Sequence, residues 1–237
     1  MNKVAIITGA SRGIGKSAAS YFAEQGYDVA LIARNRELLE ALSDELKQYY
    51  QINTGVFALD VCDREAVNAC VNQIKRNHAS IDVLFNNAGV FSFGTSEISP
   101  DDFDKLIDVN LRGVYNFTHA IVPTMKEQRN GYIFNLASDA GKHPIPTSGA
   151  YCMTKHGVVG YSQSLCLELA PFNIKVTAIC PSVIDTDMGQ AFEGFPDEDK
   201  ITCLDINKTI DYLLTLGPNA TVDEVIIKST HYLKNGR

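Results

Sequence analysis

The first fifteen residues join a short apolar run to a glycine-rich turn and then to helix-forming residues. The run is Val4-Ala5-Ile6-Ile7, and the turn is Thr8-Gly9-Ala10-Ser11-Arg12-Gly13-Ile14-Gly15. A strand, a glycine turn and a helix in this order place backbone N–H groups and the positive end of a helix dipole above the strand, where they favour a phosphate. The glycines permit a tight turn and close approach of the backbone to a pyrophosphate. Because the G-x3-G-x-G spacing is weak evidence alone, a plain strand-to-helix turn stays the alternative.

Length and composition indicate a single globular domain. The chain has 237 residues, of which 45% are hydrophobic and 21% charged, so we expect one domain over residues 1–237. A net charge of -7 argues against nucleic-acid binding, and no apolar stretch is long enough to span a membrane. The six cysteines have no metal-ligand spacing, so we predict reduced thiols, a cytoplasmic location and no metal site. They are Cys62, Cys70, Cys152, Cys166, Cys180 and Cys203.

Short apolar runs alternate with helix-forming stretches along the whole chain. The expected strands cover residues 4–7, 28–33, 55–59, 81–85, 132–136, 174–179 and 222–227. None of these runs shows an alternation of period two, which indicates strands buried on both faces. We therefore predict an α/β fold, a Rossmann-type doubly wound parallel sheet of about seven strands with helices on both faces.

Capping residues and glycines set the expected helix boundaries. Asn35, Asp63 and Ser99 each precede a helix, and Pro100 suits the first helical position. The first expected helix ends at Gly26, and the second ends at about Tyr50. A long helix is expected from residue 100 to about 128, and further helices over 151–168 and 205–216. Glycines, a proline and several acids between 187 and 203 predict a mobile substrate flap with a short helical piece.

Tyr151 and Lys155 are four residues apart at the start of an expected helix. This spacing places both side chains on one face, so they can act together. A tyrosine hydroxyl has a pKa near 10 and exchanges protons near neutrality only where a neighbouring cation stabilises its phenolate. Lys155 is positioned to be that cation. The alternative is an amphipathic tyrosine with a solvated lysine one turn later.

Several further motifs accompany this pair in a fixed order, and together they resemble a short-chain dehydrogenase/reductase of the core, single-domain type. The resemblance covers residues 3 to about 230. The motifs are Thr8-Gly9-x-x-x-Gly13-x-Gly15, Asn86-Asn87-Ala88-Gly89, Asn110, Ser138, Tyr151-x-x-x-Lys155 and Pro181-x-x-Ile184-x-Thr186. Each motif is weak alone, but the set is specific.

The resemblance implies a role for each of four catalytic residues. Tyr151 would protonate the carbonyl oxygen during reduction, and Ser138 would hydrogen-bond and orient that oxygen. Lys155 would hold the nicotinamide ribose and lower the pKa of Tyr151. Asn110, through its backbone, would anchor a water that links Lys155 to solvent.

The resemblance also implies a set of cofactor contacts along the chain. Asp60 and Val61 would meet the adenine, although Asp60 could instead be only a turn residue. Ile184 and Thr186 would meet the nicotinamide carboxamide and the phosphates. The full expected set is Thr8, Gly9, Ser11, Arg12, Gly13, Ile14, Gly15, Arg34, Asp60, Val61, Asn87, Ala88, Gly89, Tyr151, Lys155, Pro181, Ile184 and Thr186.

Two arginines indicate which nicotinamide cofactor the site takes. Arg34 follows the second strand, where NAD-dependent relatives carry an acid, and Arg12 lies in the glycine turn. Two guanidinium groups suit a 2′-phosphate, so we expect NADP, with NAD less favoured. The alternative for Arg34 is a solvated residue at a strand end.

These observations predict an NADP(H)-dependent oxidoreductase that interconverts a small ketone or aldehyde and its alcohol. The alternatives are a 3-oxoacyl carrier-protein reductase, a non-catalytic NADP-sensing regulator, and an epimerase or dehydratase of the related extended family. The chain departs from the family pattern at Ser182, where glycine is usual, and at its C-terminus, which lacks a Gly-Gly ending.

The family resemblance also implies a homotetramer or homodimer that uses the helices 101–128 and 151–168. The second helix carries Val158, Val159, Leu165 and Leu169, which is more apolar surface than one sheet face requires, although burial in the core alone could explain them.

The charges around the expected active site favour a small soluble carbonyl compound over an acyl group on an acidic carrier protein. Carrier recognition needs a basic patch near the active-site mouth. Arg129 occupies one position where carrier-dependent relatives use arginine, but Phe172 occupies the other. The flap carries the acids Asp185, Asp187, Glu193, Asp197, Glu198 and Asp199 against the lone Lys200.

Two further groups of residues near the flap have open roles at this stage. Lys142 and His143 follow Ser138 and could hold a carboxylate of a small acid or could be solvated. Met188, Phe192 and Phe195 could form an apolar lid over the substrate.

Overall fold

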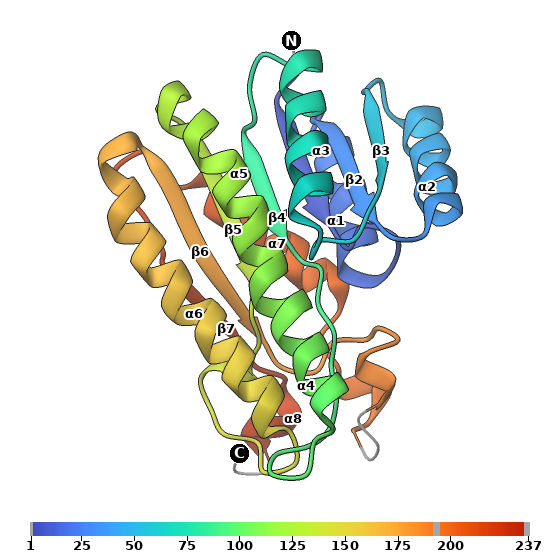
Figure 1. Ribbon diagram of the computed structural model, residues 1–237, viewed down its shortest axis with the longest axis vertical. Coiled ribbons are helices and arrows are strands. Elements are labelled where there is room, and N and C mark those ends of the chain that lie inside the picture. The colour runs from blue at the N-terminus through green and yellow to red at the C-terminus, as the bar shows by residue number, and fades with distance from the viewer. Residues whose placement is uncertain (1, 192–194, 235–237) are drawn as a thin grey trace.

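The computed structural model describes residues 2–191 and 195–234, and its centre is one seven-stranded sheet (Figure 1). The strand order is β3-β2-β1-β4-β5-β6-β7, and every neighbouring pair is parallel. The expected parallel, doubly wound sheet is therefore confirmed. The strands are β1 (Val4–Thr8), β2 (Asp28–Ala33), β3 (Thr54–Ala58), β4 (Val83–Asn86), β5 (Gly131–Leu136), β6 (Ile174–Pro181) and β7 (Glu224–Ile227).

The helices fall where the capping residues predict them. The side chains of Asn35, Asp63 and Ser99 each accept a hydrogen bond from a backbone N–H in the first turn that follows. No helix within the described residues is long and apolar enough to cross a membrane. The helices are α1 (Gly13–Glu24), α2 (Arg36–Tyr49), α3 (Arg64–Asn77), α4 (Pro100–Ile107), α5 (Gly113–Gln128), α6 (Gly149–Leu169), α7 (Cys203–Thr215) and α8 (Thr230–Lys234).

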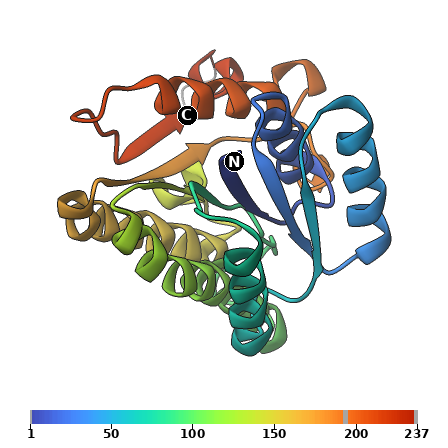
Figure 2. The same cartoon turned by 90° about the horizontal axis from the view of Figure 1, so that it is seen from above.

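Helices cover the sheet on both faces, as Figure 2 shows. Successive residues of β1 point to opposite sides, so Ala5 and Ile7 pack under α1, α2 and α7, whereas Val4 and Ile6 pack under α3, α5 and α6. All four β1 side chains are at most 1% exposed. A strand buried on both faces explains why its sequence is continuously apolar.

The expected long helix over 100–128 is one helical rod with an irregular turn in it. The π-helical turn η1 (Asp108–Arg112) separates α4 from α5 and contains Asn110. Such a turn inserts an extra residue into the helical ladder and is frequent at functional sites. Further short helical turns are η2 (Asp139–Gly141), η3 (Ala170–Phe172), η4 (Gly189–Ala191) and η5 (Asp197–Asp199).

A chain of buried polar side chains crosses the sheet and ties it to the helices on one face. Asn86 of β4 donates through Nδ2 to Oδ1 of Asn135 on β5, at 2.8 Å, and to Oγ1 of Thr118 on α5, at 3.1 Å. Asn135 in turn donates to Oγ of Ser162 on α6, at 2.9 Å. All four residues are at most 2% exposed. Because these hydrogen bonds join β4 and β5 to α5 and α6, the network fixes the two helices to the strands that reach the site.

The apolar residues of α6 that suggested an oligomer interface are part of the core. Val158, Val159, Leu165 and Leu169 are between 0% and 6% exposed, because α6 packs on the sheet and on neighbouring helices at once. The argument from these four residues is therefore wrong. The exposed apolar side chains on α5 and α6 are instead Tyr115, Met153 and Leu167, at 40%, 48% and 81%.

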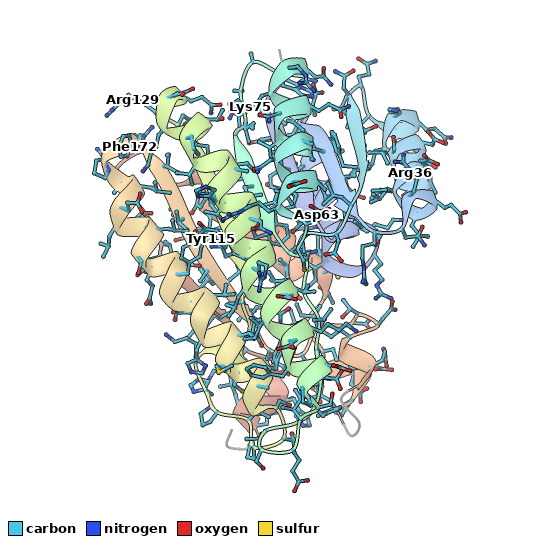
Figure 3. The ribbon with its side chains drawn as sticks, viewed as in Figure 1. Arg36, Asp63, Lys75, Tyr115, Arg129 and Phe172 are labelled. Atoms are coloured by element: carbon cyan, nitrogen blue, oxygen red, sulfur yellow. The ribbon has the colours of Figure 1, made fainter. Side chains whose placement is uncertain are left out.

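Arg129 and Phe172 lie together, but not where a patch at the active-site mouth would be. Arg129 caps α5 in a left-handed conformation and donates to the carbonyl of Pro171 at 2.9 Å. Figure 3 shows both residues at the end of α5 that is remote from α4, beside the starts of β5 and β6. A nucleotide-binding crevice lies at the opposite, carboxyl edge of a parallel sheet.

We predict that Asn135→Ala lowers the free energy of unfolding by about 2–4 kcal/mol, because it leaves the buried amide of Asn86 and the hydroxyl of Ser162 short of partners. Urea unfolding followed by circular dichroism measures the effect. The matched control is Asn130→Ala, an exposed asparagine just before the same strand, which should change the value by less than about 0.5 kcal/mol. Equal effects of the two substitutions would contradict a structural role for the network.

Candidate active site

A cleft of about 510 Å³ opens along the carboxyl edge of the sheet. Segments that follow β1, β2, β3, β4, β5 and β6 all contribute to its lining. The strand order reverses between β1 and β4, which is where an open α/β sheet forms a ligand crevice. Of the residues predicted from the sequence, those that line the cleft are Gly9, Ser11, Arg12, Gly13, Ile14, Arg34, Asp60, Val61, Asn87, Ala88, Gly89, Ser138, Tyr151, Lys155, Pro181, Ile184 and Thr186.

Thr8 and Gly15 belong to the framework of the glycine turn, and they are not among the residues that line the cleft. The Thr8 hydroxyl accepts hydrogen bonds from the backbone N–H groups of Asn87 and Ala88, both at 3.0 Å. The Asn87 side chain donates to the carbonyl of Thr8 at 2.8 Å and to that of Gly9 at 3.2 Å. These bonds fasten the glycine turn to the end of β4.

The glycine turn has no room for side chains at its critical positions. Gly9 and Gly13 have φ angles of 66° and 54°, the left-handed region that glycine favours. A Cβ atom on Gly15 would overlap the carbonyl oxygen of Gly9. No side chain caps the start of α1, so its first N–H groups face the cleft end without a side-chain acceptor. This arrangement fits a phosphate group.

Two arginines flank this end of the cleft. Arg34 is exposed beyond the end of β2, and Arg12 pairs with Asp187 of the flap at 2.9 Å. Both members of that pair are more than 70% exposed, so the ion pair contributes little, about 0–1 kcal/mol. Exchange of Asp187 for a phosphate on Arg12 is therefore energetically easy.

Asp60 is a turn residue that also lines the cleft, and its contact with the adenine stays a prediction. Its Oδ1 accepts the backbone N–H of Cys62 at 2.9 Å, as a turn residue does, and it also lines the cleft. Val61 beside it is 7% exposed and lies against Gly113 of α5. The wall at this position is a rigid surface.

Ser138, Tyr151 and Lys155 meet at the other end of the cleft. Lys155 Nζ donates to the carbonyl of Leu136 at 2.8 Å and lies 5.6 Å from the centre of the Tyr151 ring. Tyr151 and Lys155 are 7% and 5% exposed. Helix α6 presents them one turn apart above the end of β5, as the i, i+4 spacing predicts.

Burial dominates the titration of this pair. Burial raises the pKa of Tyr151, and the Ser138 hydroxyl offsets this only in part. Burial also lowers the pKa of Lys155 to about 8. Loss of hydration is the largest influence on the Tyr151 hydroxyl and raises its pKa, whereas Lys155 Nζ hydrogen-bonds to Leu136, so the expected lowering of the Tyr151 pKa by Lys155 is not seen in this structure.

Asn110 supports the site from behind the cleft wall. Its side chain exchanges two hydrogen bonds with the backbone of Val90, at 2.8 and 3.0 Å, and donates to Oγ1 of Thr154 at 3.1 Å. A Cβ atom on Gly89 would lie 3.4 Å from Asn110 Oδ1 and 3.7 Å from Lys155 Nζ. Asn110 and Lys155 thus approach the backbone of Gly89 from two sides.

An aromatic wall lines the end of the cleft that holds Tyr151, and it was not predicted from the sequence. The ring of Phe91 lies edge-on to Tyr151 at 4.9 Å and to Phe93 at 4.8 Å. Phe91, Ile145 and Met188 line the cleft. The only signal in the sequence is the pair Phe91 and Phe93, two and four residues after the Gly89 that ends the Asn86-Asn87-Ala88-Gly89 motif.

Other residues that were expected near the substrate, Lys142, His143 and Phe195, do not line the cleft. Lys142 pairs with Glu224 of β7 at 2.8 Å, and neither it nor the exposed His143 is among the residues that line the cleft. Neither expected role of Lys142, a free cation for a carboxylate or a solvated residue, is therefore observed. Phe195 packs against His231 at 4.7 Å, and Phe192 lies outside the described residues.

Ser182 uses its side chain where the family usually has glycine. Its Oγ accepts the backbone N–H of Ser229 at 2.8 Å, and its own N–H donates to the carbonyl of Ile227. Ser229 then donates through Oγ to the carbonyl of Asp199 at 2.6 Å. The segment before α8 is thereby bound both to the loop after β6 and to the flap.

We predict that burial of Lys155 destabilises the fold by on the order of 3 kcal/mol at neutral pH. The charged form is disfavoured in the folded state, so the penalty is complete below pH 8 and disappears as the pH rises from about 8 to the ordinary lysine value of 10.5. Relative to Lys155→Met, the wild-type protein should therefore gain stability across that interval. Urea unfolding of both proteins at several pH values measures this.

Lys142→Met is the matched control for this pH series. The hydrogen bond to Glu224 raises the pKa of Lys142, so its stabilising contribution is complete below 10.5 and is lost as the pH rises from 10.5 through the raised pKa. Its stability difference from wild type should stay flat between pH 8 and 10.5. A flat difference for Lys155→Met as well would refute the burial argument.

Comparison with known proteins supports a common family. A family model described as short chain dehydrogenase matches residues 3–195. An uncharacterized oxidoreductase from Staphylococcus aureus strain USA300 is 33% identical over 96% of this chain and 97% of its own. A 3-oxoacyl-[acyl-carrier-protein] reductase from Staphylococcus aureus strain Mu50 is 37% identical over 85% of this chain and 82% of its own.

Solved structures agree with the sequence matches. An alcohol dehydrogenase from the archaeon Thermococcus sibiricus, complexed with 5-hydroxy-NADP, superposes with a TM-score of 0.90 at 31% identity, over 98% of both chains. With its motifs gathered on one cleft and relatives matched along nearly all of its length, this chain belongs to the short-chain dehydrogenase family.

Proposed function

We propose that this oxidoreductase catalyses the reversible NADP(H)-dependent reduction of a small ketone or aldehyde to its alcohol. One observation carries the proposal: a single cleft has a phosphate-type glycine turn at one end and, at the other, the half-buried Ser138 with the buried Tyr151 and Lys155. The two ends supply cofactor binding and proton transfer, which are the two requirements of carbonyl reduction.

The residues of the cleft fit a dinucleotide phosphate. The turn at Gly9 and Gly13 and the uncapped start of α1 would hold the pyrophosphate, and Arg34 and Arg12 would hold the 2′-phosphate. Asp60 and Val61 would contact the adenine. The Thermococcus sibiricus relative contains an NADP derivative. The cofactor supplies the hydride, and the protein supplies position and charge.

The catalytic residues divide the proton chemistry between them. The Ser138 hydroxyl donates to the substrate oxygen and orients the carbonyl. Tyr151 transfers its hydroxyl proton to that oxygen as the alcohol forms, and the raised pKa keeps Tyr151 protonated beforehand. Lys155 Nζ, whose pKa is lowered to about 8, returns a proton to Tyr151. In oxidation the same groups act in reverse.

A second candidate function is reduction of a 3-oxoacyl group on a carrier protein. It is favoured by the identity to the Staphylococcus aureus reductase that carries this name. The flap counts against it, because Lys200 is buried and pairs with Asp197 at 2.6 Å, which leaves no exposed cation among the described flap residues. Direct competition between an acetoacetyl carrier protein and small ketones in one turnover assay separates the two functions.

The proposal includes a single domain over residues 1–237 and a homo-oligomer, dimer or tetramer. The exposed Tyr115, Met153 and Leu167 on α5 and α6 support association, because they are large apolar side chains on neighbouring helices. A sensor without turnover would need only the cofactor end of the cleft, whereas here the catalytic end is equally enclosed.

We predict that Tyr151→Phe lowers turnover by about 10²–10⁴-fold and leaves the dissociation constant for NADPH within a few-fold. The substitution removes only the hydroxyl, so the ring contact with Phe91 remains. Absorbance of the nicotinamide measures turnover, and fluorescence titration measures binding. Near wild-type turnover by the variant, on a ketone that the parent reduces, would exclude Tyr151 as the proton donor.

We predict that Arg34→Ala weakens NADPH binding by about 10- to 100-fold and leaves NADH binding unchanged, because only NADPH carries the 2′-phosphate. Dissociation constants for both cofactors provide the test. Arg36→Ala is the matched control, since Arg36 pairs with Glu40 along α2 and points away from the sheet (Figure 3). Tighter binding of NADH than NADPH by the wild-type protein would refute the cofactor assignment.

A further inference from the structure

Asp139 places a carboxylate beside the residue that would hold the substrate oxygen. It begins the turn η2, directly after Ser138, and lines the cleft. The Ser138 hydroxyl donates to Asp139 Oδ1 at 3.2 Å and to the carbonyl of Pro181 at 3.4 Å. The first of these bonds points the catalytic hydroxyl at the carboxylate.

The neighbourhood of Asp139 lacks a cation that could pair with it closely. Among the described residues, no lysine, arginine or histidine lies within 4.0 Å of its carboxylate. Burial raises the pKa of Asp139, and the Ser138 hydroxyl, the Ala140 amide, His143 and Lys228 offset this only in part. A positively charged group on a bound ligand would offset the remaining cost of burying the Asp139 carboxylate.

The charges along the cleft are divided between its two ends. The lining cations are Arg12, Arg34 and Lys155, of which the first two belong to the phosphate end and Lys155 donates to Leu136. Of the carboxylates in the described lining, Asp60 follows β3 and Asp187 pairs with Arg12, so Asp139 is the one that lies beside Ser138. A substrate carboxylate at this place would meet repulsion without a partner.

The aromatic wall lies at the same end. Phe91 and Tyr151 line the cleft with ring centres 4.9 Å apart, and Phe93 extends this group outward. Aromatic faces and edges favour an aryl or other apolar group, and aromatic faces also attract cations. Combined with a carboxylate, such a wall recognises an apolar group and an ammonium group on one small molecule.

We infer that Asp139 selects amino ketones, in which a protonated amine stands next to the carbonyl that Ser138 and Tyr151 hold. The inference rests on the proposed carbonyl reduction and names its substrate class. In an α-amino ketone two carbon atoms separate oxygen and nitrogen, a spacing that suits the 3.2 Å between Ser138 Oγ and Asp139 Oδ1. The aryl or alkyl remainder would lie on Phe91.

The existing hydrogen bond explains why a cation would help the reaction as well as binding. A neutral ketone that accepts the Ser138 hydroxyl leaves Asp139 without that donor, in a half-buried position. An ammonium group donates to Asp139 in its place and so releases Ser138 for the carbonyl oxygen. Asp139 therefore acts on specificity, whereas Tyr151 performs the proton transfer.

The test uses three aryl ketones of nearly equal shape and different charge: phenacylamine, propiophenone and phenylglyoxylate. With NADPH, kcat/KM for phenacylamine should exceed that for propiophenone by about 10- to 100-fold, the value of a charge-assisted hydrogen bond. Phenylglyoxylate should be the poorest of the three. Asp139→Asn, which keeps the shape and removes the charge, should bring phenacylamine and propiophenone within about threefold of each other.

Glu198→Gln is the matched control, because it removes one negative charge from an exposed position of the flap. It should leave the ratio of the two ketones unchanged. The inference would be overturned if the wild-type ratio of kcat/KM for phenacylamine to that for propiophenone were near one, or if Asp139→Asn and Glu198→Gln changed this ratio equally. Turnover of propiophenone would in either case still support carbonyl reduction.

A binding measurement separates this inference from the reaction itself. Calorimetry with NADP⁺ present should show that benzylamine binds the wild-type protein more tightly than phenylacetate does, and that Asp139→Asn abolishes the difference. If none of the three ketones is reduced, the proposed function fails, and the benzylamine result alone decides the charge preference. Equal binding of the two probes would exclude Asp139 as an ammonium site.

Discussion

All strands of the sheet end at the same edge, and every functional group of the cleft depends on that constraint. Right-handed crossovers through helices bring each following strand back in parallel, so the segments after β1, β4, β5 and β6 meet although they lie far apart in the sequence. Hydrogen bonds between Thr8 and Asn87 lock the first two of these segments together. The buried network of Asn86 and Asn135 connects β4 and β5 beneath them.

This edge also holds groups that a folded protein ordinarily avoids burying. Tyr151, Lys155 and Asp139 all have pKa values moved by burial toward their neutral forms. Their pKa shifts thus lie together at one end of the cleft, whereas the exposed Arg12–Asp187 pair at the other end contributes little to stability. The protein thus gives up stability at the end of the cleft where we propose that protons are exchanged.

Local patterns were sufficient to predict most of the fold and the cofactor end of the cleft. Caps such as Asn35 and Asp63, apolar runs and the glycine turn each act over a few residues, so the sequence alone fixes their outcome. The substrate end was not predictable in the same way. The contacts of Phe91 with Tyr151 and of Lys142 with Glu224 join segments separated by 60 and 82 residues, and nothing local to either partner indicates them.

Ser182 shows how a departure from a family pattern acquires a physical reason once such distant contacts are known. A glycine at this position would offer backbone freedom, which a serine gives up. Its φ lies outside the left-handed region, so the backbone needs no glycine there. Its hydroxyl instead satisfies the buried N–H of Ser229, 47 residues away, and Ser229 in turn binds the carbonyl of Asp199.

The loop after β6, the flap and the segment before α8 are therefore one connected unit. Any movement of the flap must carry or break these bonds, which couples the flap to the C-terminal segment even though that segment does not line the cleft.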